Sequence, residues 1–537
     1  MNKTKKMLAA MMAAGMLASV GLSGCSSDKE EQGAAASTAP GAATASATAA
    51  ASKPVTLKVL LSGYGTLQDT GKVLEEANKV LGQLLPNTQM SLEFVPAEQY
   101  EEKLRLLISA GEQVDVANFS NGIGSAKNDL VVEAKKGTMM VLDDLVKAVP
   151  DLTKEIPASV FERGKVEGKL YEVPIYQTVT DKFIGIKMHK ELADQYMGAD
   201  TLAKLKTTLD NNGVLTKDTY DILTAYLKNL KDNNQIRRGA SVETMAWLPQ
   251  KGYYSLYNWA FVVKKEDNGS KVLNYFEQPE VKMMYDVHTD WYQKGYVEKD
   301  ILSMQNRRQY EKKPDGNVLA MTTQNVSDPD FPDMDNDIND TKAYGFPVAT
   351  VAWAKNYVIG PGNMQGLIIP RTSKNPERAM QLIDLLNTQK GLELQQLLCY
   401  GIEGTHYTRD EKGAITPLVK DAAQAKYAAM NFNIGNLLLK DPKSKDTYPD
   451  FIREVANKKA LVMPLAGFKL DIEPIKSELA QFDAARKEFE LGLYSGASPK
   501  VDELYQQMID KMKKAGSDKI IAEMQKQVDT YLKTAGK

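Results

Sequence analysis

Hydrophobic and polar positions beyond residue 53 follow first the period of strands and then that of helices. Val55 to Leu61 alternates and then stays apolar, which predicts a strand in a sheet covered on both faces. The pattern then predicts a helix over 70–85, a strand over 90–95, a helix over 98–109 and a strand over 114–119. Repeated strand–helix units of this length predict an α/β fold with mainly parallel sheets.

The second half of the chain is predicted to be richer in helix. Apolar residues at helical spacing recur over 217–230, 279–294, 376–386 and 391–398, and residues 475–537 are almost wholly helical. A body of about 480 residues exceeds the usual length of one domain, so we expect two or more lobes.

The N-terminus carries the pattern of an export signal. Three lysines within the first six residues precede an apolar run over 7–22, which is short for a membrane span. The run ends in Leu22-Ser23-Gly24-Cys25, which resembles the lipobox of bacterial lipoproteins. We expect a signal peptide over 1–24 and lipidation of Cys25; an ordinary secretory signal with a chance cysteine is the alternative.

Residues 26–52 consist mostly of Ala, Ser, Thr and Gly. Such a segment buries too little apolar surface to offset the entropy of ordering it. We therefore expect residues 25–53 to form a disordered stalk that begins at the lipidated cysteine. This anchor would place the body at the cell membrane, on its extracytoplasmic face.

Composition narrows the classes of function. The net charge is −2 and no basic block is present, which argues against nucleic-acid binding. The two cysteines are Cys25 and Cys399, so we expect no disulfide within the body. The three histidines show no zinc-hydrolase spacing, and no nucleophile elbow or phosphate-binding loop occurs. We predict no catalytic residue, no metal and no cofactor.

Two carboxylate-based alternatives stay open. A glycosidase needs two facing carboxylates, and 69 acidic residues allow many pairs without selecting one. The acidic run over 328–340 is dense enough to bind calcium weakly. Its spacing does not fit an EF-hand, so we interpret it as an exposed acidic loop.

A set of segments spread over the body resembles the extracellular solute-binding proteins of family 1, the receptors of carbohydrate ABC importers. Each segment alone is weakly specific, but together they occur in the family's order. The segments are 55–64, VDVANF at 114–119, LDDL at 142–145, GKLYEVP at 168–174, WYQKGY at 291–296, IPRTSKNPE at 369–377 and YGIEGTHY at 400–407. Residues 496–532 are similar to a C-terminal domain of unassigned function in the larger lipoproteins of this family.

The resemblance implies a two-lobed, periplasmic-binding-protein-like clam with a helical C-terminal region at 475–537. The body would span 54–474, with the chain crossing between lobes near 170–180 and 320–400. It also implies a monomer that captures an oligosaccharide or related sugar and delivers it to ABC permease subunits. Two other classes stay open, namely a surface glycan-degrading enzyme and a lipoprotein that senses glycans or assists secretion.

Candidate ligand-binding residues combine aromatic rings, which stack on sugars, with amides and acids, which bond hydroxyls. Open α/β sheets bind ligands beyond the carboxyl ends of their strands. The candidates are Tyr64, Asn118, Asn121, Tyr176, Gln177, Trp353, Glu403 and His406. For each a structural role is the alternative: Asn118 could cap a helix, and Glu403 and His406 could belong to an exposed turn.

Overall fold

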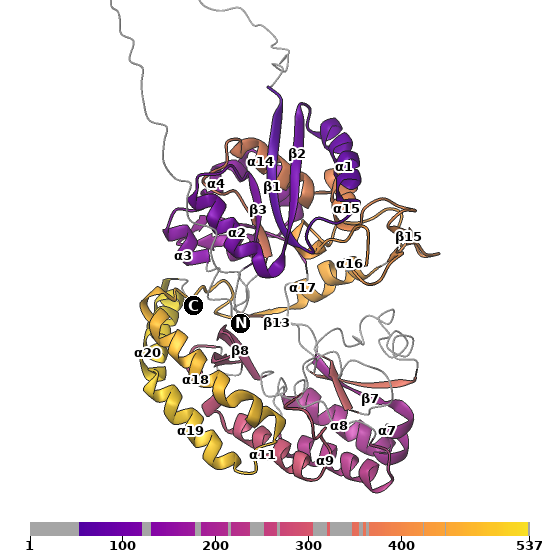
Figure 1. Cartoon of the computed structure of the whole chain (residues 1–537), viewed down its shortest axis with the longest axis vertical. Coiled ribbons are helices and arrows are strands. Elements are labelled where there is room, and N and C mark those ends of the chain that lie inside the picture. The colour runs from indigo at the N-terminus through magenta and orange to yellow at the C-terminus, as the bar shows by residue number, and fades with distance from the viewer. Residues whose placement is uncertain are drawn as a thin grey trace, which may run out of the picture. The chain divides into compact units, whose positions relative to one another are not determined.

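The computed structural model describes most of the chain after the N-terminal segment (Figure 1). The described residues are 53–120, 130–177, 184–212, 216–236, 252–265, 269–303, 319–322, 346–353, 358–360, 365–422, 424–445 and 447–534. The expected signal peptide, Cys25 and the stalk to residue 52 lie outside them, and so does the acidic run at 328–340. Residues 53–537 form a single compact unit.

The first lobe is built on a five-stranded sheet in the order β2-β1-β3-β14-β6. β1 (Val55–Gly63) pairs in parallel with the edge strand β2 (Thr88–Pro96) on one side and with β3 (Val116–Ser120) on the other. β14 (Gln365–Ile368) returns to this sheet from far along the chain and pairs antiparallel with β3 and with β6 (Val173–Pro174). The carboxyl ends of β1, β2, β3 and β6 therefore meet at one edge, beside the start of β14.

Helices cover both faces of this sheet. Alternate residues of β1 point to opposite sides, so that Leu57, Val59 and Leu61 enter one core and Leu60 the other. The first core is closed by α1 (Thr70–Leu84), α4 (Asp143–Lys147), α5 (Pro150–Glu155), α14 (Pro376–Asn387) and α15 (Leu392–Tyr400). The second core is closed by α2 (Ala97–Ser109) and α3 (Leu130–Lys135). A sheet buried on both faces explains the apolar run that predicted β1.

The second lobe has two three-stranded sheets. One has the order β11-β7-β12, formed by β7 (Ile184–His189), β11 (Leu319–Thr322) and β12 (Val348–Trp353). The other has the order β10-β9-β8, formed by β8 (Tyr253–Tyr257), β9 (Phe261–Lys264) and β10 (Val272–Asn274). All pairs in both sheets are antiparallel, so parallel pairing among the described strands is confined to β1–β2, β1–β3 and the short β13–β17 pair.

Helices from two distant parts of the chain pack on these sheets. The earlier ones are α7 (Lys190–Tyr196), α8 (Ala199–Asn212), α9 (Lys217–Asp232) and α11 (Pro279–Gln293). The C-terminal ones are α18 (Lys476–Ser495), α19 (Val501–Lys514) and α20 (Ser517–Thr534). Figure 1 shows α18 beside α11 and α19, in agreement with their contacts. One hydrophobic core holds both sets, so the C-terminal region completes the second lobe.

Short elements connect the lobes. β4 (Lys165–Val166) and β5 (Lys169–Leu170) form a hairpin just before β6. β13 (Val358–Ile359) pairs in parallel with β17 (Leu461–Val462), which leads into the C-terminal region. The remaining described elements of the first lobe are α6 (Ala158–Phe161), β15 (Tyr407–Arg409), β16 (Ile415–Pro417), α16 (Tyr448–Phe451) and α17 (Asn457–Lys459). Within the described residues, no helix is long and apolar enough to cross a membrane.

Candidate functional site

The carboxyl edge of the first-lobe sheet gathers several of the predicted site residues. Tyr64 directly follows β1, and Gln177 lies three residues beyond the end of β6. The register pairs Gln365 with Ser120, and the Ile175 N–H donates to the Gln365 carbonyl at 2.8 Å. These contacts bring the ends of three strands together, as the strand order requires.

Two aromatic rings are exposed at this edge. Tyr64 is 47% exposed, and Phe432 is 40% exposed in a 3-10 turn over Asn431–Asn433. This turn contacts both β1 and β14. The Asn433 side-chain amide donates to the Ser62 carbonyl at 3.1 Å, which ties the turn to the end of β1. The edge therefore carries two accessible aromatic faces on adjoining segments.

Phe432 was missed from the sequence because its turn lies far from β1 along the chain. The only signal is the arrangement Asn431-Phe432-Asn433, an aromatic residue between two amides. The fold gives the second amide its role, since Asn433 is 3% exposed and bonds the strand.

Asn118 lies inside the first lobe. It is 1% exposed, and its side-chain oxygen accepts from the Ser62 N–H at 2.6 Å. Its carbonyl accepts from the buried Tyr100 hydroxyl at 2.8 Å. Asn118 thus joins β3 to the end of β1, and it caps none of the described helices.

Tyr176 and Gln177 share one partner. Tyr176 is 3% exposed and packs in the core of the first lobe, so its ring offers no open face in this structure. The Asn457 amide donates to the Tyr176 hydroxyl at 3.4 Å and to the Gln177 carbonyl at 3.3 Å. Gln177 is itself only partly buried. Asn457 therefore holds the backbone that presents the Gln177 side chain.

His406 is buried and has a partner on each ring nitrogen. Its Nδ1 accepts from the Ile402 N–H at 2.9 Å, which leaves the proton on Nε2, 3.4 Å from the Asp69 carboxylate. Lys72 and His406 hold the pKa of Asp69 below its ordinary value against the effect of burial. The contact fastens the loop before β15 to the segment between β1 and α1.

Glu403 is accessible but paired. Its carboxylate lies 3.5 Å from Arg409 and 3.7 Å from Lys443, and its side chain is 46% exposed. Arg409 also bonds Asp441 at 2.8 Å. These contacts place Glu403 in an ion-pair network around β15.

Two predicted residues have no described side chain. Trp353 ends β12, where its backbone pairs with Ile184, and nothing is described of its side chain. Asn121 lies outside the described residues, as does the candidate calcium loop at 328–340. Elsewhere in the described part of the chain, no group of three or more histidine, cysteine or acidic side chains could hold a metal.

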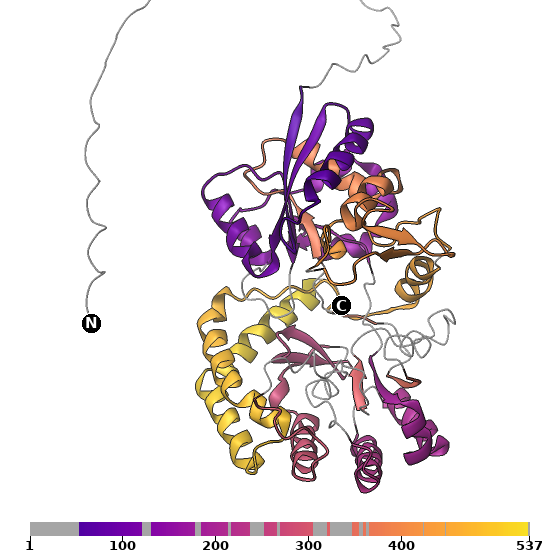
Figure 2. The ribbon, with the colours of Figure 1, turned by 45° about the vertical axis from the view of Figure 1, so that its right-hand side comes forward.

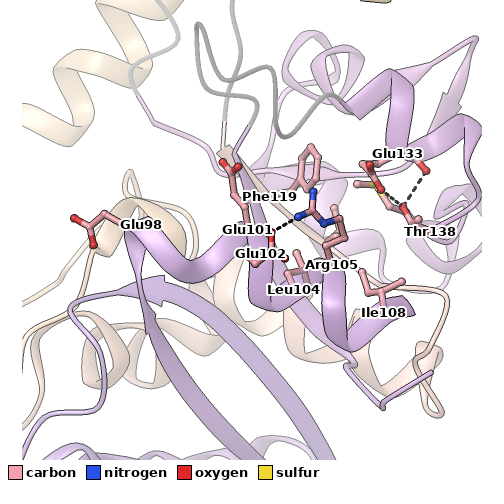
Figure 3. A pocket seen from close by; sticks show the side chains of 11 residues that line it. Glu98, Glu101, Glu102, Leu104, Arg105, Ile108, Phe119, Glu133 and Thr138 are labelled. Atoms are coloured by element: carbon pink, nitrogen blue, oxygen red, sulfur yellow. Dashed lines mark hydrogen bonds and ion pairs between the residues drawn. The ribbon is translucent and has the colours of Figure 1, made fainter. Parts of the chain in front are cut away.

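A separate cavity lies on the first lobe between α2 and the strand face beneath it (Figure 3). Its volume is about 130 Å³, below the range of about 300–1,000 Å³ typical of small-molecule sites. Figure 3 shows Arg105 directed at Glu102 and Thr138 at Glu133, and hydrogen bonds join both pairs. These partners occupy two of the carboxylates in the lining, and the volume is small, so the cavity is a poor fit for a sugar.

Comparison with known families gives two matches. Residues 65–393 match the family described as bacterial extracellular solute-binding protein. Residues 464–533 match a domain of unknown function, DUF3502. The first match covers more than half of the 537 residues, and the second covers most of the C-terminal helices.

Individual relatives cover almost the whole chain. A carbohydrate ABC transporter substrate-binding protein from Streptococcus pneumoniae is 24% identical over 473 residues, which is 86% of this chain and 88% of the relative. The crystal structure of the N-glycan transport solute-binding protein from Streptococcus pneumoniae has a TM-score of 0.67 and 22% identity, covering 89% of this chain and 99% of that one. The same protein in complex with Man5GlcNAc has a TM-score of 0.59, with the same identity and coverage. The two-lobed solute-binding fold expected from the sequence is confirmed.

Proposed function

Because the chain belongs to the bacterial extracellular solute-binding protein family, we propose that it captures an oligosaccharide outside the cytoplasm and delivers it to an ABC importer. The relatives support this class of ligand: one is a carbohydrate ABC transporter substrate-binding protein, and another was crystallised with Man5GlcNAc. The protein binds the sugar without altering it.

The exposed aromatic pair at the carboxyl edge carries the proposal. Tyr64 and Phe432 are accessible, and the Asn433–Ser62 hydrogen bond ties their segments together. The apolar face of a pyranose stacks on such rings, which lose little conformational entropy on binding. Gln177, held beside the same edge by its backbone contact with Asn457, supplies an amide for hydroxyl groups.

The buried candidates receive a supporting role in this proposal. Asn118 fixes the end of β1 before Tyr64, and His406 fixes the loop that follows it through Asp69. Tyr176 anchors the segment that presents Gln177. Asn121, Trp353 and Glu403 stay proposed ligand contacts, with Glu403 leaving its ion pairs to bond a hydroxyl.

The test is a thermal-shift screen against a panel of oligosaccharides that includes Man5GlcNAc, followed by calorimetry. Tyr64→Ala and Phe432→Ala should each weaken binding of a confirmed sugar by about 1–3 kcal/mol, roughly ten- to a hundredfold. Leu106→Ala is the matched control, because Leu106 is 59% exposed on α2, away from the aromatic pair. Wild-type affinity in both aromatic variants would place the site elsewhere, and cleavage of the sugar during incubation would make the protein an enzyme.

We further propose that the body is tethered to the extracytoplasmic face of the cell membrane. Residues 1–24 act as a signal peptide, Cys25 carries the lipid, and residues 25–53 form the stalk. The protein then acts as a monomer beside its permease subunits. Cys25→Ser should abolish membrane association in a fractionation experiment, and equal association of the variant and the wild type would contradict the anchor.

A further inference from the structure

The matched domain of unknown function begins with a segment, residues 463–472, that contacts both lobes. On one side it belongs to the second lobe: Leu465, Phe468 and Ile472 are buried in that core. The Tyr531 hydroxyl donates to the Ala466 carbonyl at 2.7 Å, and the Tyr531 ring packs edge-on against Phe468 at 5.5 Å. The start of the segment is thereby bound to α20.

Gln527 binds the end of the same segment. Its side-chain oxygen accepts from the Asp471 N–H at 2.8 Å, and its amide donates to the Asp471 carbonyl at 2.9 Å. A side chain that bonds both backbone groups of one residue fixes that residue in position. Because Gln527 bonds only the backbone of Asp471, the Asp471 carboxylate is available to other groups.

One carboxylate oxygen of Asp471 accepts from the nearby Glu473 N–H at 3.1 Å, and the other has its partner in the first lobe. The Asp471 carboxylate is 2.7 Å from the Lys135 ammonium at the end of α3. The Lys469 ammonium donates to the Arg163 carbonyl, just before the β4–β5 hairpin. Val132 of α3 is buried in the second-lobe core and is the one described first-lobe residue in it. An ion pair and a hydrogen bond thus join the segment to two elements of the first lobe, and Val132 joins α3 to the second-lobe core.

The stretch of chain that Lys469 contacts is tightly packed. Glu172 is 1% exposed between Gly164 and Gly366, and a Cβ on Gly366 would lie 2.2 Å from the Glu172 carboxylate. A Cβ on Gly164 would lie 2.0 Å from the Glu172 carbonyl. Burial raises the pKa of Glu172 to about 8, and the Lys469 ammonium opposes that rise. Lys469 is thus the cation beside a buried carboxyl group, next to the point where the chain leaves for the second lobe.

We propose that the C-terminal domain is a brace for solute binding: Lys469 and Asp471 hold residues 163–172 and α3, and so restrict how the lobes move about this connection. Lys469 and Asp471 are positioning residues and touch no ligand. A looser connection has more conformational freedom to lose when a sugar is enclosed, so we expect weaker binding without the brace. This consequence for affinity rests on the proposed function. The structural part of the inference needs no ligand.

The experiment uses the full chain with Cys25→Ser and two variants, Lys469→Met and Asp471→Asn. Lys476→Met is the matched control, since Lys476 forms an exposed pair with Glu473 in the same region. Hydrogen exchange is measured without sugar for peptides over 163–172 and over 130–135, the range of α3. The distance between spin labels at Leu106→Cys and Leu302→Cys is measured in the same state. Both label sites are exposed, at 59% and 49%, whereas Cys399 is buried and does not compete for the label.

We expect exchange to become about tenfold faster over 163–172 in Lys469→Met and over 130–135 in Asp471→Asn, with a broader label distance in both and no change in the control. Asp471→Asn keeps the backbone bonds to Gln527, so it stays informative if Lys469→Met folds poorly. Wild-type exchange and distances in both variants would overturn the brace. Calorimetry with Man5GlcNAc then tests the consequence for affinity. Loss of preorganisation should weaken binding roughly three- to tenfold in the variants. Unchanged affinity would overturn this consequence. If the wild type itself binds no oligosaccharide, the proposed function fails while the exchange result still decides the brace.

Discussion

The two lobes reach a buried core by different routes. In the first lobe, one sheet receives helices on both faces, and β1, α1, β2, α2 and β3 follow one another along the chain. In the second lobe, the core joins residues near 186–301 to residues 463–528. Figure 2 shows the C-terminal helices packed beside the sheet that contains β8.

This difference indicates where each kind of function can reside. The parallel strands of the first lobe end together and present exposed aromatic rings at one edge. The second lobe depends on a distant C-terminal segment, so its stability is coupled to the connection between lobes. The predictions below test that contrast, from the largest expected effect to the smallest.

Phe482→Ala should destabilise the second lobe most. The ring is fully buried on α18, and its centroid lies 4.7 Å from that of Phe261 and 6.5 Å from that of Phe276. It therefore joins the C-terminal region to the earlier part of the second lobe. Loss of a buried aromatic ring costs about 3–5 kcal/mol of unfolding free energy. Leu491→Ala on the same helix, at a site 36% exposed, is the control and should change stability by less than about 1 kcal/mol. Denaturant unfolding measures both, and equal effects would mean that α18 is not part of this core.

The second lobe should also lose stability in acid through His288. This ring is fully buried and donates from Nδ1 to the Tyr494 carbonyl at 2.7 Å, and its Nε2 has no hydrogen-bond partner among the described residues. Burial lowers the pKa of His288 to about 4. The unfolded chain therefore takes up this proton first, and stability falls as the pH drops from about 6.5 towards 4, by up to roughly 3 kcal/mol.

Unfolding curves of the wild type and His288→Gln between pH 7 and 4 measure this loss. The variant should show a shallower fall in unfolding free energy over that range. Parallel curves would show that the ring is protonated in the folded protein without cost.

The connection between lobes should have the opposite pH dependence. Because burial raises the pKa of Glu172 to about 8, its neutral form supports the fold, and stability falls as the pH rises from about 4.5 to 8. Glu172→Gln keeps the shape and cannot ionise, so it should gain roughly 1–3 kcal/mol relative to the wild type at pH 8 and little at pH 4.5. A variant that loses stability at pH 8 would show that attraction to the Lys469 ammonium outweighs the cost of burying the charge.

Asn433→Ala should have the smallest effect on stability and a clear effect on binding. It removes the hydrogen bond to the Ser62 carbonyl, worth about 1 kcal/mol. The turn that carries Phe432 then loses its tie to β1, so we expect a several-fold loss of affinity for a confirmed sugar. Asn431→Ala is the neighbouring control, and calorimetry with denaturant unfolding separates the two effects. Affinity that falls only in proportion to the folded fraction would leave Asn433 no role in the site.

Local patterns predicted most elements closely. Helix 70–85 is observed as Thr70–Leu84, helix 279–294 as Pro279–Gln293 and helix 376–386 as Pro376–Asn387. The last two begin at a proline, whose missing N–H suits the first helical turn. The antiparallel sheets of the second lobe were not foreseen, because their partner strands lie far apart in the sequence and carry no direct mark of direction.

The site residues show the same difference between local patterns and contacts with distant segments. Tyr64 was predicted from its position after a strand and Gln177 from its position after the crossing segment, and both lie at the carboxyl edge, because such positions are local features. The burial of Asn118, Tyr176 and His406 could not be predicted from such positions. The same polar or aromatic residue can bind a ligand or stabilise the fold, depending on what packs against it. Phe432 escaped notice because only the return of a distant turn brings it to β1.

The sequence by itself determined the class of protein, because the strand–helix units of the first lobe and the ordered family segments are legible in the order of residues. The export signal and the lipidation of Cys25 stay predictions. Tertiary structure decided which side chains stay exposed at the sheet edge and that residues 463–534 complete the second lobe. The reason is that local periodicity reports which face of an element is buried, whereas the identity of the neighbour that buries it depends on contacts between residues hundreds of positions apart.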